Sequence, residues 1–234
     1  MTDPSAIPSP NIWESPEVYE LENLGVDRAG VIESAMRERH DWAGQDVLDV
    51  GCGTGFHLPT FAQTSRSVVG VEPHAALATR ARGHVATLPN VRVIHAGAEA
   101  TTLPARSVDV VYARWAYFFG PGCEPGLAEL ARVIRPGGTA FVVDNDATRS
   151  TFGMWFRRSL PRYDPAAVER FWARQGWSRV PLDIAWTFDS PDDFARVLRI
   201  ELPGRLADEI LAADPGRTGV DYGVNLWWRR WPTA

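Results

Sequence analysis

The sequence contains no lysine. All 24 of its basic residues are arginines, and its 29 acidic residues bring the net charge to −5. Broad electrostatic capture of nucleic acid or of an anionic membrane requires a basic face, so we expect neither partner. Only Cys52 and Cys123 are cysteines, which argues against a disulfide framework and a cysteine-based metal site. The five histidines are scattered without metal-ligand spacing, and we expect no metal.

Long apolar runs are also absent. No stretch approaches the ~18 apolar residues that a membrane span needs. The first twelve residues show no charged segment followed by an apolar one, so no secretory signal is expected. A length of 234 residues with 45% hydrophobic content is typical of one domain that buries a full core. We expect a reduced, cytoplasmic protein that is either a monomer or a homodimer.

Short apolar runs alternate with amphipathic segments through the middle of the chain. Strands are predicted over residues 47–50, 67–71, 91–95, 108–113 and 140–144, and helices over 55–64, 75–86 and 124–135. This alternation is typical of βαβ units, whose parallel sheet is covered by helices on both faces. Pro136-Gly137-Gly138 is expected to end the last of these helices and to lead into the fifth strand.

The two flanks of this core differ from it. Residues 1–16 are rich in proline and serine and are predicted to form a flexible arm, and a single domain is expected over 17–234. In that domain, 17–40 is helical, 45–145 is the core, and 146–234 carries helical insertions and the last two strands. The elements expected after the core are helices over 149–160, 165–176, from 190 onward and over 204–213, and strands over 180–188 and 220–231.

A glycine-rich loop, Gly51-Cys52-Gly53-Thr54-Gly55, follows the first predicted strand and precedes a helix. Glycines permit positive φ angles and let backbone N–H groups approach a ligand closely. The GxGxG spacing differs from the GxGxxG of dinucleotide folds. Taken alone, the loop is also compatible with a tight strand–helix turn that binds nothing.

Glu72 adds a second feature, 21 residues after Gly51, at the end of the second predicted strand. A carboxylate at that place can accept hydrogen bonds from both hydroxyls of a ribose. The alternative is a surface glutamate that merely ends a strand. The loop and the acid together favour a nucleoside site.

Five ordered segments resemble the class I S-adenosylmethionine-dependent methyltransferases of the small-molecule type. They are VLDVGCGTG, Glu72, HAGAE with the following Leu103-Pro104, SVDVV, and LAELARVIRPGG, and they cover residues 45–145. The resemblance implies an α/β fold with a doubly wound, mostly parallel seven-stranded sheet, Rossmann-like, whose last strand is antiparallel. It also implies an N-terminal helical lid and a helical insertion after strand five.

The resemblance further implies that the chain binds S-adenosylmethionine and forms S-adenosylhomocysteine. It places Asp49 and the glycines near the methionine part, Glu72 at the ribose, Ala98 at the adenine and Tyr19 at the methionine carboxylate. The cofactor residues expected in this way are Asp49, Gly51, Cys52, Gly53, Gly55, His57, Glu72, Pro73, Ala98, Glu99, Ala113, Arg114 and Tyr19. Gly97 stands where the family often has an adenine-side Asp, so backbone, apolar walls and Glu99 would hold the adenine.

The acceptor side carries no obligatory catalytic signature, because a sulfonium donor is already activated and the protein mainly orients the reactants. Acceptor-site candidates on the lid, at the carboxyl ends of strands and in the insertion are Trp13, Trp115, Tyr117, Phe118, Asn145 and Trp155. Ordinary packing is the alternative for each aromatic, and capping of the next helix is the alternative for Asn145. Arg114, Tyr117 and His57 are the candidate catalytic residues, and Arg114 suits an anionic or carbonyl-bearing acceptor.

Three other functions remain alternatives. A nucleotide-dependent oxidoreductase shares the loop and the acid, but not the GxGxG spacing or the RPGG turn. A non-catalytic S-adenosylmethionine-binding protein would keep the same motifs. A tRNA or protein methyltransferase is disfavoured by the acidic balance and by ARWAYF after strand four, where an Asn-Pro-Pro-Tyr-type segment would be expected. The sequence favours methyl transfer to a small molecule, with O-, N- and C-methylation unresolved.

Overall fold

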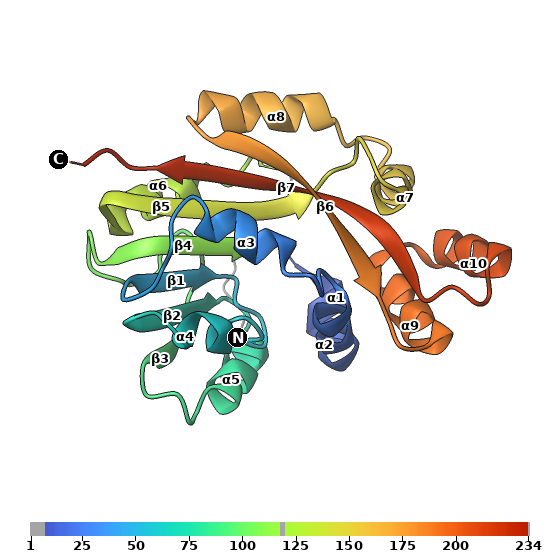
Figure 1. Ribbon diagram of the computed structural model, residues 1–234, viewed down its shortest axis with the longest axis horizontal. Helices are drawn as coiled ribbons and strands as arrows, with labels where there is room; N and C mark the ends of the chain where they lie inside the picture. Colours follow the sequence, from blue (N-terminus) through green and yellow to red (C-terminus); the bar gives the residue numbers. More distant parts are fainter. Residues whose placement is uncertain (1–7, 118–119, 234) are drawn as a thin grey trace.

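The computed structural model describes residues 8–117 and 120–233, which are built around a seven-stranded sheet (Figure 1). The strand order is β3-β2-β1-β4-β5-β7-β6. The strands are β1 (Asp46–Val50), β2 (Ser67–Glu72), β3 (Val91–His95), β4 (Val108–Arg114), β5 (Ile134–Asn145), β6 (Ser178–Thr187) and β7 (Gly219–Arg230). Strands β1 to β5 pair in parallel, whereas β7 runs antiparallel to both β5 and β6. The expected doubly wound sheet with an antiparallel last strand is confirmed.

Helices cover both faces of this sheet. They are α1 (Pro10–Glu14), α2 (Pro16–Gly25), α3 (Val31–Arg37), α4 (Leu58–Ala62), α5 (Ala75–His84), α6 (Glu124–Val133), α7 (Thr151–Ser159), α8 (Pro165–Arg174), α9 (Pro191–Glu201) and α10 (Gly204–Ala213). No helix in residues 8–117 and 120–233 is long and apolar enough to cross a membrane.

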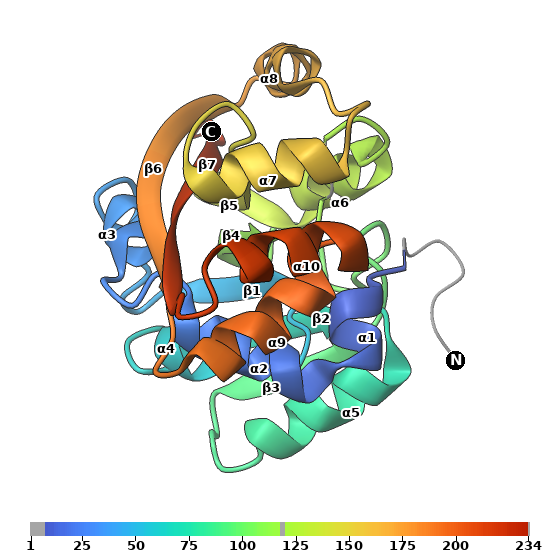
Figure 2. The same ribbon diagram turned by 90° about the vertical axis from the view of Figure 1, so that its right-hand side faces the viewer.

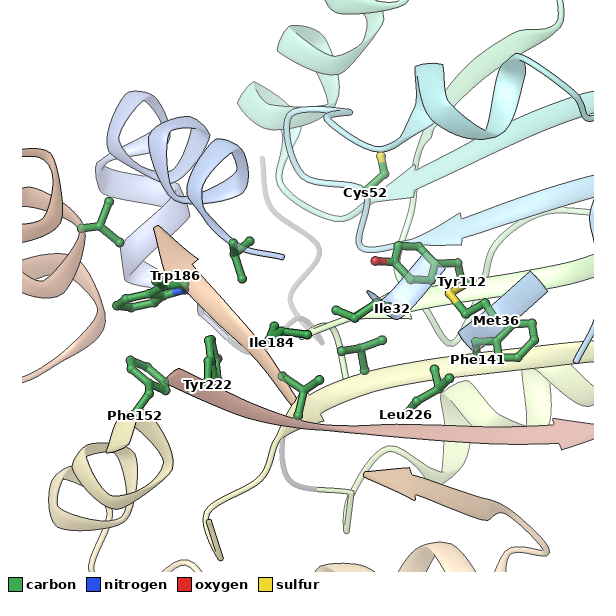
Figure 3. Packing of buried hydrophobic residues seen from close by; sticks show 14 of the residues in the cluster. Ile32, Met36, Cys52, Tyr112, Phe141, Phe152, Ile184, Trp186, Tyr222 and Leu226 are labelled. Carbon is green, nitrogen blue, oxygen red and sulfur yellow. The ribbon is translucent and has the colours of Figure 1, made fainter. Parts of the chain in front are cut away.

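Two hydrophobic clusters fill the space between helices and sheet. Val47 and Leu48 are fully buried in opposite clusters, because successive side chains of a strand point to opposite faces. One cluster includes Met36 of α3 and Phe61 of α4, and the other includes Trp172 of α8. Figure 3 shows part of the first cluster. A sheet buried on both faces accounts for the apolar runs that the sequence shows at its strands.

The N-terminal region differs from the sequence-based expectation. The arm expected over residues 1–16 is replaced from Pro10 onward by helix α1, which Pro10 begins at its first position. The helical stretch expected over 17–40 is broken into α2 and α3. Asp27 lies between them with φ 54°, and its carboxylate accepts hydrogen bonds from the backbone N–H groups of Val31 and Ile32, both at 2.9 Å. This carboxylate starts α3 as a separate helix.

The Pro136-Gly137-Gly138 turn also lies elsewhere than expected. Helix α6 ends at Val133, and the turn falls inside β5 instead of before it. Between β4 and β5, the pairing jumps from Val108–Ile134 to Val110–Thr139, which makes a bulge. Pro136 has no N–H to donate, and Gly137 has φ 83°, so this stretch interrupts the ladder without ending the strand.

Helices α1, α2, α9 and α10 lie beyond the carboxyl ends of the parallel strands (Figures 1 and 2). Two polar contacts hold α2 in this position. Glu20 accepts a hydrogen bond from the Thr54 hydroxyl in the glycine-rich loop, and Glu17 forms an ion pair of 2.6 Å with Arg80 of α5. The predicted N-terminal helical lid therefore corresponds to α1 and α2.

Candidate active site

A cavity of about 420 Å³ lies at the carboxyl ends of β1, β2 and β4, below α1 and α2. Many residues singled out in the sequence line its wall. From the expected cofactor set these are Tyr19, Gly51, Gly53, Glu72, Pro73, Ala98, Glu99 and Arg114, and from the expected acceptor set Trp13, Trp115 and Tyr117. Segments far apart in the sequence thus meet at one cavity, as the carboxyl edge of an open α/β sheet requires.

The glycine-rich loop needs glycine for two separate reasons. Gly51 and Gly53 have φ angles of 72° and 56°, in the left-handed region that favours glycine. A Cβ atom at Gly51 would lie 2.7 Å from the Cβ of Ala116, and one at Gly53 would lie 2.8 Å from Cδ1 of Ile12 in α1. The loop therefore passes close to both the end of β4 and the helix above it.

Glu72 is buried at the end of β2, with 4% of its surface exposed. Its Oε2 accepts a hydrogen bond of 3.0 Å from the Gly53 N–H, and its Oε1 accepts one of 2.8 Å from the His74 N–H. Burial raises the pKa of the carboxyl, and these two hydrogen bonds oppose the rise. Each carboxylate oxygen has a second lone pair. Glu72 can therefore hold the loop in place and still accept hydroxyl groups of a ligand in the cavity.

Five expected cofactor residues do not line this cavity: Asp49, Cys52, Gly55, His57 and Ala113. Asp49 is buried, and burial together with the charge of Glu72 raises its pKa to about 7. Cys52 packs into the first hydrophobic cluster, where a Cβ atom at Gly70 would lie 2.7 Å from its Sγ. Ala113 is fully buried in β4. Asp49 and Ala113 lie in β1 and β4, where the alternation of side chains directs them away from the face that their neighbours Val50 and Arg114 present to the cavity.

His57 and Arg114 meet at a second cavity of about 230 Å³, which Arg114 shares with the first. Arg114 Nη1 lies 3.2 Å from His57 Nε2, so this nitrogen accepts the hydrogen bond. Burial and the neighbouring guanidinium hold the pKa of His57 well below its usual range. A neutral imidazole whose Nε2 is occupied orients Arg114 and is poorly suited to act as a base.

Arg114 is itself incompletely paired. Its Nε and Nη2 atoms are buried and have no hydrogen-bond partner among the described residues. Its guanidinium carbon lies 4.3 Å from the centre of the Trp115 ring, a cation–π contact. Buried donors of a charged group strongly favour an anionic partner. The first cavity therefore has one wall, at Arg114, that is suited to an anion.

A third cavity, of about 110 Å³, adjoins the first and shares Ser9, Tyr19, Trp115 and Tyr117 with it. Asn145 also lines it, and its Oδ1 accepts hydrogen bonds from Trp115 Nε1, at 2.7 Å, and from the Tyr222 hydroxyl. Asn145 therefore orients the aromatic wall by way of its side-chain oxygen.

The remaining acceptor candidates lie in different places. Trp13 stacks on His74 at the first cavity, with ring centres 4.7 Å apart. Trp155 lines none of the three cavities and packs against Phe152, with ring centres 6.4 Å apart. Phe118 lies outside the described residues. The hydroxyl of Tyr117 is buried, and burial raises its pKa. The group therefore stays protonated and takes part in hydrogen bonds without acting as a base.

The residues of the third cavity that were not expected from the sequence include Glu22, Asp144, Glu201 and Tyr222. They come from α2, β5, α9 and β7. Residues 8–117 and 120–233 contain no group of three or more His, Cys, Asp or Glu side chains that could hold a metal ion. Glu201 reaches the cavity because α9 packs beside α2 (Figure 2), which no local pattern encodes.

Part of the chain is similar to known proteins. The sequence profile of a methyltransferase domain matches residues 47–138. A probable S-adenosylmethionine-dependent methyltransferase from Mycolicibacterium smegmatis is 33% identical over 139 residues, which are 59% of this chain and 52% of that protein. A demethylmenaquinone methyltransferase from Tropheryma whipplei is 27% identical over 164 residues, covering 61% of this chain and 68% of the relative. The chain thus spans about half of the length of the mycobacterial relative.

Solved structures share the fold. The YcgJ protein from Bacillus subtilis superposes with a TM-score of 0.63 at 17% identity, covering 86% of this chain and 98% of that one. A SAM-dependent methyltransferase from Aquifex aeolicus gives a TM-score of 0.57 at 18% identity, covering 91% and 97%. At such identities, the likeness concerns the fold alone. The sequence match is to a methyltransferase domain over residues 47–138, and these solved structures share the fold of the chain.

Proposed function

We propose that the chain transfers a methyl group from S-adenosylmethionine to a small-molecule acceptor. The observation that carries the proposal is the pairing of two opposite polar groups in one cavity. Glu72 presents carboxylate lone pairs, and Arg114 presents buried donors without a partner. S-adenosylmethionine has a ribose diol and an amino-acid carboxylate, which complement these two groups.

The other walls of the first cavity agree with this assignment. Leu77, Ala98 and Pro73 give it an apolar side next to Glu72, which suits an adenine ring. Trp115 and Tyr19 lie where the first and third cavities meet. Aromatic faces stabilise a nearby cation, so this junction suits a sulfonium. We assign the methionine end to Arg114 and Tyr19, and the ribose to Glu72.

S-adenosylmethionine supplies an activated methyl group, so the chain contributes mainly by orienting the acceptor and by excluding water. Orientation alone can lower the reaction barrier by roughly 7–11 kcal/mol. Helices α1 and α2 close over the site, and Asn145 orients Trp115. Neither His57, with its low pKa, nor Tyr117, with its raised pKa, is suited to be a general base. We therefore assign them to positioning.

The small third cavity supports a small-molecule acceptor. Its 110 Å³ would receive part of a compact molecule and not an extended macromolecular segment. The net charge of −5 also disfavours nucleic acid. The relative from T. whipplei is named for methylation of demethylmenaquinone, which is itself a small molecule.

Calorimetry with S-adenosylmethionine, S-adenosylhomocysteine and a nicotinamide dinucleotide tests the donor. We expect the two sulfur compounds to bind at one site per chain and the dinucleotide not to bind. Formation of S-adenosylhomocysteine with a panel of small acceptors then tests turnover. Binding of the dinucleotide alone would refute the proposed donor, and binding without turnover of any acceptor would favour a non-catalytic protein.

A further inference from the structure

Three carboxyl groups line the third cavity. Glu22 comes from α2, Asp144 from the end of β5, and Glu201 from the end of α9. Glu22 and Asp144 expose only 4% and 7% of their surface. Within residues 8–117 and 120–233, none of the three forms an ion pair. Carboxyl groups buried in this way ordinarily need a partner.

Two of their oxygen atoms are poorly satisfied. Oε2 of Glu22 and Oδ2 of Asp144 are buried without a hydrogen bond of good geometry among the described residues, although Glu201 interacts with Glu22 and Trp227 interacts with Asp144. Two amides contact the other oxygens of the cluster: Asn11 donates to Glu201 Oε1 at 2.6 Å, and Asn225 donates to Asp144 Oδ1 at 2.8 Å. An unsatisfied buried acceptor costs about 1–3 kcal/mol, and more when it is charged. The cavity is therefore suited to a ligand that brings hydrogen-bond donors.

The charge of the cavity points to a cation. Burial raises the pKa of Glu22 and Glu201, and the negative charge of Glu201 raises that of Glu22 further, so the two share a proton. Burial also raises the pKa of Asp144 to about 7. Arg179 pairs with Asp146 at 2.8 Å, and the positive charge of Arg114 opposes the rise in the pKa of Glu22. The raised pKa values lower the negative charge of the empty cavity, and a bound cation would favour the ionised forms of these carboxyl groups.

Aromatic rings form a large part of the remaining wall. Trp115 and Tyr222 stack with ring centres 6.1 Å apart and an interplanar angle of 16°, and Tyr19 lies next to them. Figure 3 shows Tyr222 beside Phe152 and Trp186, which pack against it from the core side. Aromatic walls combined with carboxylates are the chemistry that recognises organic ammonium groups.

We propose that this cavity binds the ammonium group of the methyl acceptor, so that the substrate is an amine that carries a positive charge in solution. The inference rests on the proposed methyl transfer and names its substrate class. A carboxylate or phenolate would be repelled by Glu22, Glu201 and Asp144. A neutral hydroxyl supplies one hydrogen-bond donor, whereas a primary ammonium group supplies three for the acceptor oxygens of this cavity. The volume of 110 Å³ accommodates the charged end of a molecule, and the shared wall at Tyr19 and Trp115 joins it to the cofactor cavity.

The same carboxyl groups account for the proton that amine methylation must release. The ammonium first loses one proton, and the freed lone pair on nitrogen then forms the bond to the methyl carbon. The carbon–sulfur bond breaks, and its electron pair stays on sulfur, which becomes the thioether of S-adenosylhomocysteine. Glu22 and Glu201 share one proton, and their raised pKa values allow the pair to take up the second.

The inference is tested by binding of methylammonium chloride to the complex with S-adenosylhomocysteine, with sodium chloride and sodium acetate at equal ionic strength as comparisons. The indole N–H resonance of Trp115 reports on the cavity, because that group lines its wall. We expect a saturable shift with methylammonium alone. The double variant Glu22→Gln/Glu201→Gln should weaken it roughly tenfold or more, and Asp144→Asn should weaken it separately.

Glu38→Gln is the matched control, since this exposed glutamate lies at the end of α3 and forms only a 3.6 Å contact with Arg39. It should bind methylammonium as the parent does. Equal shifts with sodium chloride, a saturable shift with acetate, or unchanged methylammonium affinity in folded carboxamide variants would each overturn the inference. Calorimetry with S-adenosylhomocysteine distinguishes failure of the amine inference from failure of the proposed methyl transfer. A chain that binds this product but not methylammonium refutes the amine alone, whereas a chain that binds neither also refutes the proposed function.

Discussion

Replacement of Glu72 by glutamine isolates the role of one carboxylate oxygen. Both oxygens of Glu72 accept a backbone hydrogen bond, from Gly53 and from His74. Glutamine has nearly the same shape but only one acceptor oxygen, and its NH2 group would face one of these two N–H donors. The variant therefore loses a charge-assisted hydrogen bond to the chain and an acceptor for the ribose.

The magnitude follows from these contacts. A hydrogen bond to a charged group contributes about 1.5–3 kcal/mol, and an unsatisfied buried donor costs about 1–3 kcal/mol. In the free protein, part of this loss is offset because the variant no longer buries a negative charge at a side chain that is only 4% exposed. The ligand complex has no such compensation at the ribose. We expect the affinity for S-adenosylhomocysteine to fall roughly tenfold to one-hundredfold, with a smaller change in the melting temperature.

Isothermal calorimetry with S-adenosylhomocysteine measures the loss, with Glu38→Gln as a control of the same chemistry at an exposed site. A second readout is the titration of Asp49. The charge of Glu72 helps to raise the pKa of Asp49 to about 7, so the glutamine variant should lower that pKa, as carboxyl NMR can show. Unchanged affinity in a folded Glu72→Gln variant would refute the ribose assignment, even if the Asp49 titration moved.

Three further predictions concern other parts of the site. Gly51→Ala should lower the free energy of unfolding by about 1–3 kcal/mol in urea denaturation, because φ is 72° and the new Cβ would lie 2.7 Å from Ala116; wild-type stability would contradict the loop geometry. Arg114→Met should weaken S-adenosylhomocysteine binding about tenfold or more. The melting temperature of the free protein should stay unchanged or rise, because the substitution removes a buried cation with unpaired donors. A large fall in that temperature would show that Arg114 is structural. Asp144, with its pKa raised from 3.8 to about 7, folds more favourably when protonated. Its contribution is therefore fully present below pH 4 and is lost as the pH rises to about 7, by up to about 4 kcal/mol at 1.36 kcal/mol per pKa unit. Asp144→Asn should flatten this part of the stability–pH curve measured by chemical denaturation, and an unchanged curve would argue against the raised pKa.

The core could be predicted because its signals are local. Each parallel strand is a short apolar run, since both faces of the sheet are buried, and the glycine-rich loop and Glu72 lie within a single βαβ unit. The break at Asp27 was missed because it depends on one side chain that starts α3. Helix α1 had a readable signal in Ser9 and Pro10, which the abundance of proline in the arm obscured.

The acceptor side could not be predicted in the same way. Glu22 and Glu201 are 179 residues apart in the sequence and meet only because α2 packs beside α9. Tyr222 belongs to a strand whose neighbours become known only with the register of the sheet. Arg114 was correctly placed at the end of its strand, but the direction of its guanidinium toward His57 depends on rotamers and burial. Tertiary packing, which short motifs do not encode, decides these contacts.

The wall that the first and third cavities share separates the residues proposed to bind the donor from those proposed to bind the acceptor. In the proposed assignment, Tyr19 and segments between β1 and β4 hold the donor, whereas Glu201 and Tyr222 come from the last third of the chain. Substitutions in α9 and β7 can therefore change which acceptor is recognised without disturbing the donor. Tyr19 and Trp115 belong to both cavities, so changes there alter both specificities at once. Sequence changes in α9 and β7 are therefore the expected route by which related proteins acquire different acceptor specificities.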